Sequence, residues 1–347
     1  MIDLTNLEEI AKIDPANTYK TTSLANEQAK AAWEQVKALP IQPLKEKVSS
    51  VVFCGMGASI YGALVLKALF ADKLPFPIET VSDYLIPSYA DKNTLVVLTS
   101  YSGTTEEVLS CANEAKERNA NILVLTKGGP LAQFAKDNNI PAYIFDGKLN
   151  LSSTPRLGNG YTIIGLLGLF NKLGLVHITD KEMIDSFAYL DTQLEDIKSE
   201  GLKESEIFMN KIPIVIAAEH LSGNAQILRN QFNETSKAFS ALYLVPDLNH
   251  HLMEGLQFPK ESKLYFLILN SHHYSPKIAK RMELTVDVIK KNGHEVLNSF
   301  PQGKNKMEEF LETLTFGSWL TLFLGLRYNQ DPSINPWVDW FKKELSK

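Results

Sequence analysis

Short apolar segments alternate with longer amphipathic segments through the first half of the chain. Segments that are apolar throughout are typical of strands buried on both faces, and their alternation with helices predicts a parallel sheet covered on both sides. The expected strands occupy residues 51–56, 77–82, 94–100, 122–126 and 141–145, and the expected helices occupy residues 59–70, 105–119, 131–138 and 161–174.

The same pattern begins again in the second half of the chain. Strands are expected at 212–219, 263–270 and 294–300, and helices at 180–200, 221–234, 275–293 and 305–327. The repetition predicts an α/β protein built from two doubly wound parallel-sheet units of one architecture. In such sheets, ligands bind at the carboxyl ends of the strands.

Helical patterns also flank the two units. The segment "NEQAKAAWEQVKAL" places Ala29, Ala32, Trp33 and Val36 on one side of an N-terminal helix. Near the C-terminus, Trp337, Val338 and Phe341 fall at helical spacing and are expected to anchor a final helix. The expected division of the chain is an N-terminal helical arm (1–44), a first domain (45–176), a second domain (177–330) and a C-terminal helix (331–347).

Composition narrows the class of protein. The 347 residues are 44% hydrophobic and 22% charged, and the net charge of −5 is spread along the chain, which argues against a nucleic-acid surface. No apolar segment reaches the length of a membrane span, and the N-terminus lacks an apolar signal core, so we expect a cytoplasmic protein. Cys54 and Cys111 fall in a strand and a helix, and we expect both to be reduced core thiols.

Two turns at neighbouring strand ends are candidates for binding an anion. "CGMGAS" (54–59) and "SYSGTTEE" (100–107) each end a strand and open a helix, whose N-terminus offers free N–H groups and partial positive charge. Several neutral donors that converge on one point suit a phosphate monoester. The candidate phosphate-binding residues are Gly57, Ser59, Ser100, Ser102 and Thr105.

Two other interpretations of these turns remain. A serine or threonine followed by glutamate is common as a simple helix cap, although two such turns together favour phosphate. A dinucleotide site is the second alternative, but Ile60 replaces the third glycine of its motif, and the hydroxyl-rich turn has no role there.

The turns "CGMGAS" and "SYSGTTEE" resemble those of the sugar isomerase (SIS) domain, whose members bind phosphosugars. From about residue 45 to the end, "STPRLGNG", "RNQFNETSKAF", "DLNHHLMEG" and a lysine-bearing C-terminal helix resemble the bifunctional phosphoglucose/phosphomannose isomerases. The resemblance implies tandem SIS domains and conversion of glucose 6-phosphate to fructose 6-phosphate by ring opening and proton transfer through an enediolate. It implies neither metal nor cofactor, and leaves open whether mannose 6-phosphate is accepted. The alternative is a non-catalytic SIS-domain phosphosugar sensor.

The resemblance also implies which residues act. Glu234 matches the base that moves the proton, and His250 matches the ring-opening acid and base, which the neighbouring subunit supplies; this implies a homodimer with shared sites. Lys342 matches the C-terminal lysine, with the adjacent Lys343 as the alternative, and Arg156 is the nearest strong cation for binding substrate.

The course of the chain between Glu234 and His250 decides whether His250 can serve the site of its own subunit. "AFSALYLVPD" between them is expected to be extended and to lead away from Glu234. If the chain instead doubles back at residues 245–247, His250 serves its own subunit.

Overall fold

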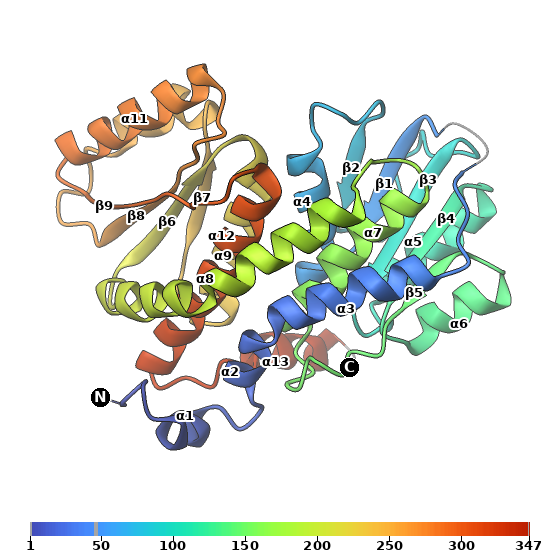
Figure 1. Cartoon of the computed structure of the whole chain (residues 1–347), viewed down its shortest axis with the longest axis horizontal. Helices are drawn as coiled ribbons and strands as arrows, with labels where there is room; N and C mark the ends of the chain where they lie inside the picture. The colour runs from blue at the N-terminus through green and yellow to red at the C-terminus, as the bar shows by residue number, and fades with distance from the viewer. Residues whose placement is uncertain (1, 45–47, 346) are drawn as a thin grey trace.

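Two parallel sheets flanked by helices lie side by side in the molecule (Figure 1). The computed structural model describes residues 2–44, 48–345 and 347. Residue 45, where the sequence places the start of the first domain, lies outside the described residues. The two α/β units expected from the repeated pattern are confirmed.

The first sheet has the strand order β2-β1-β3-β4-β5, with every pairing parallel. Its chain winds outward in both directions from β1 and β3, so the carboxyl ends of these two neighbours form the point at which ligands bind in such sheets. The strands are β1 (Ser50–Cys54), β2 (Ile78–Val81), β3 (Thr94–Ser100), β4 (Asn121–Thr126) and β5 (Ala142–Ile144). The turn and helices between them are η1 (Gly57–Ile60), α4 (Tyr61–Leu69), α5 (Glu106–Glu117) and α6 (Gly129–Asp137).

The second sheet has the order β7-β6-β8-β9 and is also entirely parallel. It too winds outward from two central neighbours, β6 and β8. The strands are β6 (Ile212–Ala217), β7 (Ala241–Leu244), β8 (Leu264–Leu269) and β9 (Glu295–Ser299). The turns and helices are η4 (Glu219–Leu221), α9 (Ser222–Glu234), η5 (Asp247–His250), α10 (Leu252–Gly255), α11 (Pro276–Lys291) and α12 (Lys306–Arg327).

The two units match in detail as well as in order. The register pairs Cys54 with Leu98 in the first sheet and Ile216 with Ile268 in the second. A short 3-10 turn follows the first strand of each pair and opens with a residue of positive φ, which is +55° at Gly57 and +41° at Glu219 in the second unit. Such a φ is rare outside glycine, so its recurrence marks the same local backbone geometry.

Long helices join the two units. After the first sheet the chain forms η2 (Pro155–Leu157), the π-helical turn η3 (Gly160–Ile164), α7 (Gly165–Lys172) and α8 (Asp180–Ile207). α8 packs along α12 within the second unit, and α4 of the first unit packs against α9 and η4 of the second. The interface between the units is therefore made of helices, as Figure 1 shows between the sheets.

The N-terminal arm packs as the sequence predicts. It comprises α1 (Leu7–Ile13), α2 (Thr18–Ser23) and α3 (Ala25–Ala38). Ala29, Ala32, Trp33 and Val36 are all buried, and α3 lies against η3 and α7. Cys54 and Cys111 are buried free thiols, as expected.

The C-terminal helix α13 (Pro336–Leu345) differs from its prediction. Trp337, Val338 and Phe341 are 81%, 45% and 56% exposed, so the expectation that they anchor the helix to its own chain is wrong. The spacing correctly indicated an apolar helical face, but no described part of the same chain covers that face.

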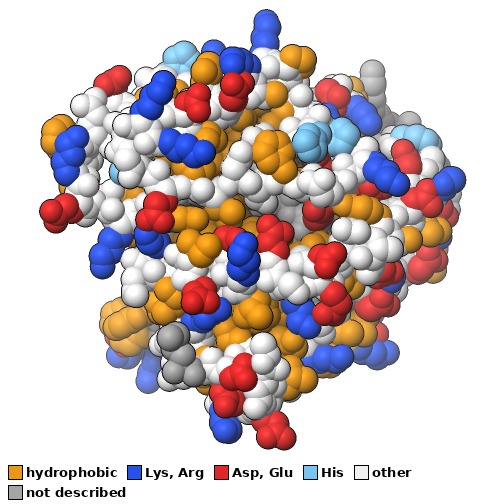
Figure 2. Space-filling model, turned by 60° about the vertical axis from the view of Figure 1, so that its left-hand side comes forward, with side chains coloured by type: hydrophobic (Ala, Val, Ile, Leu, Met, Phe, Trp, Pro, Cys, Tyr) orange, Lys and Arg blue, Asp and Glu red, His pale blue; other side chains and the backbone are white. Residues whose placement is uncertain are grey.

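The surface has a mixed charge. On the face drawn in Figure 2, acidic and basic side chains are interspersed, with hydrophobic side chains between them. None of the helices in the described part of the chain is both long and apolar enough to cross a membrane.

Candidate active site

The hydroxyl groups of the second glycine-rich turn bond to one another. Ser100 is buried at the end of β3, where its Oγ accepts a hydrogen bond from the Gly103 N–H at 3.0 Å and lies 2.7 Å from Thr105 Oγ1. Ser102 Oγ lies 2.8 Å from Thr104 Oγ1 at the exposed side of the turn. The turn therefore presents a preorganised set of hydroxyls.

The turn after β1 is joined to this one. The Tyr101 N–H donates to Ser59 Oγ at 3.1 Å, which fixes the two turns side by side. Gly57 has a φ of +55°, and a Cβ placed on it would meet open space, so its surface faces solvent. All five candidate phosphate-binding residues lie on these two adjoining turns.

The helices that open here are not capped by side chains of the described chain. Thr105 is the N-cap residue of α5, yet its side chain makes no capping bond, and η1 also begins without one. The alternative of a simple serine or threonine cap is therefore not what the structure shows. The N–H groups at the start of α5 stay available to an anion.

Arg156 lies in η2 and is only 3% exposed. Its guanidinium crosses from the first unit to the second: Nε donates to Thr235 Oγ1 at 3.2 Å, and Nη2 donates to the carbonyl oxygens of Pro332 and, at 3.2 Å, Ser333. The remaining nitrogen, Nη1, lies 3.8 Å from Glu234 Oε2. Arg156 and Glu234 are thus brought together.

Asn335 completes this cluster at the start of α13. With its amide oxygen turned toward Arg156, it accepts from Nη1 at 3.0 Å, and its nitrogen donates to the Ile334 carbonyl at 2.8 Å. The segment before the C-terminal helix is therefore tied to the guanidinium.

Lys237 holds the same segment from the other side. Its Nζ donates to the carbonyl oxygens of Glu234 at 2.5 Å and Ile334 at 2.6 Å. Burial, followed by the nearby charge of Arg156, lowers the pKa of Lys237 to about 8.

Tyr61, close to the turn after β1, responds to the charge of Glu234. The phenol is buried at the start of α4, two positions after Ser59. Burial raises the pKa of Tyr61, and the negative charge of Glu234 raises it further. η2, which holds Arg156, also packs against η1. The hydroxyl-lined turns, Arg156 and Glu234 therefore lie together beyond the carboxyl ends of β1 and β3.

His250 lies elsewhere in the same chain. Glu234 is the last residue of α9. It lies next to the start of β7, since the side-chain nitrogen of the adjacent Asn233 donates to the Ser240 carbonyl oxygen at 3.4 Å. β7 then runs parallel to β6, and His250 lies exposed in η5 beyond its carboxyl end. The extended segment leading away from Glu234 is confirmed, and a four-residue strand of about 13 Å separates the two ends.

Among the described residues, Lys342 makes no hydrogen bond or ion pair with this cluster either. It lies exposed on α13, six positions after Pro336 and thus about 9 Å along the helix axis from its start. Sequence reasoning missed Tyr61, Lys237 and Asn335. Lys237 falls within "NETSK", beside the expected base, which is the signal that could have pointed to it.

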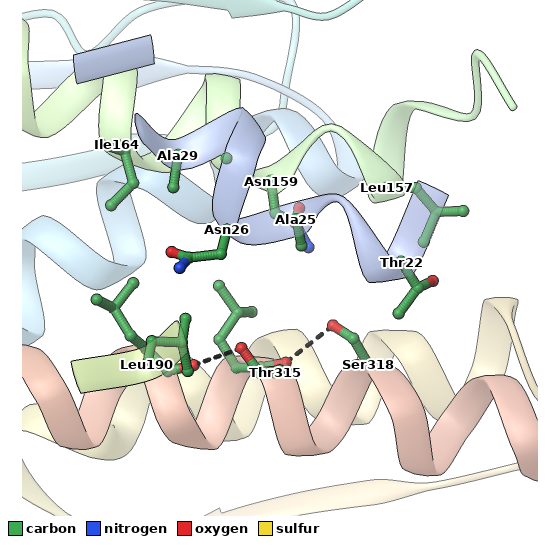
Figure 3. A pocket seen from close by; sticks show the side chains of 13 residues that line it. Thr22, Ala25, Asn26, Ala29, Leu157, Asn159, Ile164, Leu190, Thr315 and Ser318 are labelled. Carbon is green, nitrogen blue, oxygen red and sulfur yellow. Dashed lines mark hydrogen bonds between the residues drawn. The ribbon is translucent and has the colours of Figure 1, made fainter. Parts of the chain in front are cut away.

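An interior cavity lies apart from this cluster (Figure 3). The arm, the 157–164 segment, α8 and α12 enclose it, and Asn26 and Asn159 are among its lining residues. Its volume of about 30 Å³ is far below the 300–1,000 Å³ of ordinary small-molecule sites, so it is not the place for a sugar phosphate.

Comparison with known proteins gives a consistent result. The SIS domain family matches residues 45–143, and the family described as bacterial phospho-glucose isomerase C-terminal SIS domain matches residues 198–345. Among solved structures, glucosamine-6-phosphate deaminase from Thermotoga maritima superposes with a TM-score of 0.71 at 17% identity, covering 91% of this chain and 97% of that one. At this identity the likeness shows the fold alone.

Curated relatives are similar over nearly the full length. A bifunctional phosphoglucose/phosphomannose isomerase from Caldicellulosiruptor bescii is 30% identical over 334 residues, covering 92% of this chain and 96% of that protein. One from Aquifex aeolicus is 27% identical over 317 residues, covering 91% and 94%. The chain belongs to the bifunctional phosphoglucose/phosphomannose isomerase family.

Proposed function

We propose that this protein is an aldose–ketose isomerase that converts glucose 6-phosphate and mannose 6-phosphate to fructose 6-phosphate. The observation that supports this best is the pairing of Glu234 with Arg156 beside the hydroxyl-lined turns. The names of the two relatives above, which specify both phosphoglucose and phosphomannose, favour the two aldose substrates.

The substrate phosphate binds at the two turns of the first unit. Ser59, Ser100, Ser102 and Thr105 supply hydroxyl donors, and Gly57 lets the anion approach the backbone. The uncapped N–H groups of α5 add partial positive charge. Such an arrangement of neutral donors suits a phosphate dianion without any lysine or arginine.

Glu234 then moves the proton. Its carboxylate takes the proton from C2 of the open-chain aldose, the electron pair forms the C1–C2 double bond, and negative charge develops on O1. A proton passes from O2 to O1, and returning the first proton to C1 then leaves the ketone at C2 and a hydroxyl group at C1. Nη1 of Arg156 faces this chemistry: one of its two N–H groups is bound by Asn335, and the other is on the side of Glu234, where it can stabilise a sugar oxygen rather than the phosphate.

Ring opening is assigned to His250 from a second copy of the chain, with Lys342 assisting. Within one chain, Glu234 lies at the start of β7 and His250 lies past its carboxyl end. This separation supports a homodimer in which His250 of one copy serves the site of the other. The exposed apolar residues of α13 support the same dimer, because a second copy would cover them.

A direct assay tests the function. Purified protein supplied with fructose 6-phosphate should yield glucose 6-phosphate, which is measured by coupling its formation to glucose-6-phosphate dehydrogenase. In a parallel assay, mannose 6-phosphate should be consumed. Tight binding of fructose 6-phosphate with no turnover would instead identify a phosphosugar sensor.

A further inference from the structure

Lys237 joins the backbone of the proposed base to the segment before α13. Glu234 is the last residue of α9, so its carbonyl oxygen has no partner within the helix. Lys237 Nζ donates to this oxygen at 2.5 Å and to the carbonyl oxygen of Ile334 at 2.6 Å. A lysine near the C-terminal end of a helix also suits the partial negative charge there. One ammonium group therefore fixes Glu234 and the distant Ile334 to each other.

A second cation holds residues 332–335, which we call the strap. Nη2 of Arg156 donates to the carbonyl oxygens of Pro332 and, at 3.2 Å, Ser333. Nη1 of the same guanidinium donates to the side-chain oxygen of Asn335 at 3.0 Å. Each of the four residues of the strap is thus bonded to one of the two cations.

These contacts form a closed ring that passes through Glu234. Lys237 joins the backbone of Glu234 to the strap, and Arg156 joins the strap to the Glu234 carboxylate, whose Oε2 lies 3.8 Å from Nη1. A side chain that is 32% exposed, as Glu234 is, is only partly confined by packing. The ring therefore limits how far the carboxylate can move from the guanidinium.

The backbone of Lys237 is strained. Its φ is +58°, in the left-handed region, which glycine adopts freely and a lysine adopts at a cost in free energy. The two hydrogen bonds of the side chain offset this cost. Both carbonyl oxygens that it bonds lie outside the first unit, whose turns are proposed to bind the phosphate.

We propose that Lys237 is a positioning residue for the proton transfer. It holds the backbone of Glu234 against the strap and so sets the place of the carboxylate relative to Arg156. The role rests on the proposed function, in which Glu234 is the base. Because Nζ is directed at backbone oxygens and not at the substrate, loss of Lys237 slows the proton transfer and leaves phosphate binding unchanged.

Lys237→Met tests this role, because methionine is also unbranched but has no N–H donor. Misplacing a catalytic group by about 1 Å can cost about 10²-fold in rate, so we expect kcat to fall by about 10–10²-fold. The KM for fructose 6-phosphate should stay within about 2-fold of the wild type, as for an interaction that matters only in the transition state. Exchange of deuterium from C2 of glucose 6-phosphate into solvent should slow by the same factor as kcat.

Two control variants separate positioning from stability and from charge. Ser240→Ala removes a buried hydroxyl that donates to the Pro213 carbonyl oxygen at 2.8 Å, outside the ring, and should lower the Tm without lowering kcat. Lys280→Met makes the same substitution at an exposed lysine of α11, whose Nζ pairs with Glu283 at 2.8 Å, and should change neither.

Lys237→Gly gives a second test that does not depend on the folding of Lys237→Met. Glycine accepts the positive φ without strain, and n-butylammonium has the length and the N–H donors of the missing side chain. Added n-butylammonium should raise the kcat of this variant several-fold and leave that of the wild type unchanged. Tetramethylammonium carries the same charge but no N–H donor, so it should not raise kcat.

The outcomes distinguish this role from the proposed function. Wild-type kcat in Lys237→Met, a rise in KM without a fall in kcat, or a Lys237→Gly variant that does not respond to n-butylammonium would overturn the positioning role and leave the isomerase assignment standing. Absence of turnover by the wild type would overturn the proposed function and the positioning role together.

Discussion

The Nη1 atom of Arg156 lies 3.8 Å from Oε2 of Glu234, and this contact joins the first unit to the second. The two side chains differ in exposure: Arg156 is 3% exposed, whereas Glu234 is 32% exposed. The cation is thus fixed and little screened, while the carboxylate can reach a substrate. The proposed site therefore needs residues from both units.

Glu234→Gln should lower kcat by about 10²–10⁴-fold, because the amide keeps the shape of the side chain but cannot accept the proton. Exchange of deuterium from C2 of glucose 6-phosphate into solvent, followed by NMR, should be seen with the wild type and lost in the variant. Glu206→Gln, the same change at an exposed glutamate of α8, is the control and should leave both measurements unaltered. Normal turnover by Glu234→Gln would show that the base lies elsewhere.

Ser100→Ala should raise the KM for the sugar phosphate by about 10-fold. The lost hydrogen bond to a charged group is worth roughly 1.5–3 kcal/mol. Since Ser100 Oγ also accepts from the Gly103 N–H, a small loss of Tm is expected as well. Ser240→Ala, which removes a buried hydroxyl bonded to the Pro213 carbonyl of the second unit, should lower the Tm without changing KM. An unchanged KM for Ser100→Ala removes this residue from the phosphate site.

Arg156→Lys should lose both stability and activity although it keeps the charge. A lysine ammonium cannot reproduce the planar fork that serves Thr235, Ser333 and Glu234 together. We expect kcat/KM to fall at least 10-fold, since about 1.4 kcal/mol of lost transition-state stabilisation suffices for that. Thermal unfolding and steady-state kinetics measure the two effects. Wild-type values for both would mean that the guanidinium geometry is unimportant.

Lys237 should make folding stability depend on pH above 8. Its pKa is about 8 in the folded state and about 10.4 in the unfolded chain, so between these values the unfolded state binds more protons. The cost of burying the charged amine is present below pH 8 and is relieved as the pH rises toward 10.4, so the wild type becomes more stable relative to Lys237→Met. Urea unfolding of both proteins at pH 7.5 and 9.5 measures this difference. Parallel pH dependences would show that Lys237 does not titrate in this window.

Local sequence patterns predicted the fold well because each strand and helix has its own periodicity. β3, for example, was expected at 94–100 and is observed at Thr94–Ser100. The hydroxyl-rich turns could be found for the same reason, since their donors lie within a few residues of a strand end. The divisions between domains stay a prediction.

Contacts between distant segments were not predictable in this way. Arg156 and Asn335 are far apart in sequence, and only the packing of η2 against the end of the second unit brings them together. The exposure of Trp337 and Phe341 shows the same limit, because helical spacing identifies an apolar face but does not predict which surface covers it.

Mixing two inactive variants tests whether the active site is shared. Within one chain Glu234 and His250 lie beyond opposite ends of β7, so a site that uses both requires a second copy related by a two-fold axis. Glu234→Gln and His250→Ala homodimers should each be nearly inactive. Their heterodimer should contain one doubly defective site and one intact site, and should recover about half of the wild-type activity per dimer on this symmetry argument. His251→Ala, the same change at the neighbouring histidine, is the matched control and should be active as a homodimer. If heterodimers form, as native mass spectrometry can show, and activity does not return, each His250 serves its own subunit, and the isomerase assignment stands without the shared site.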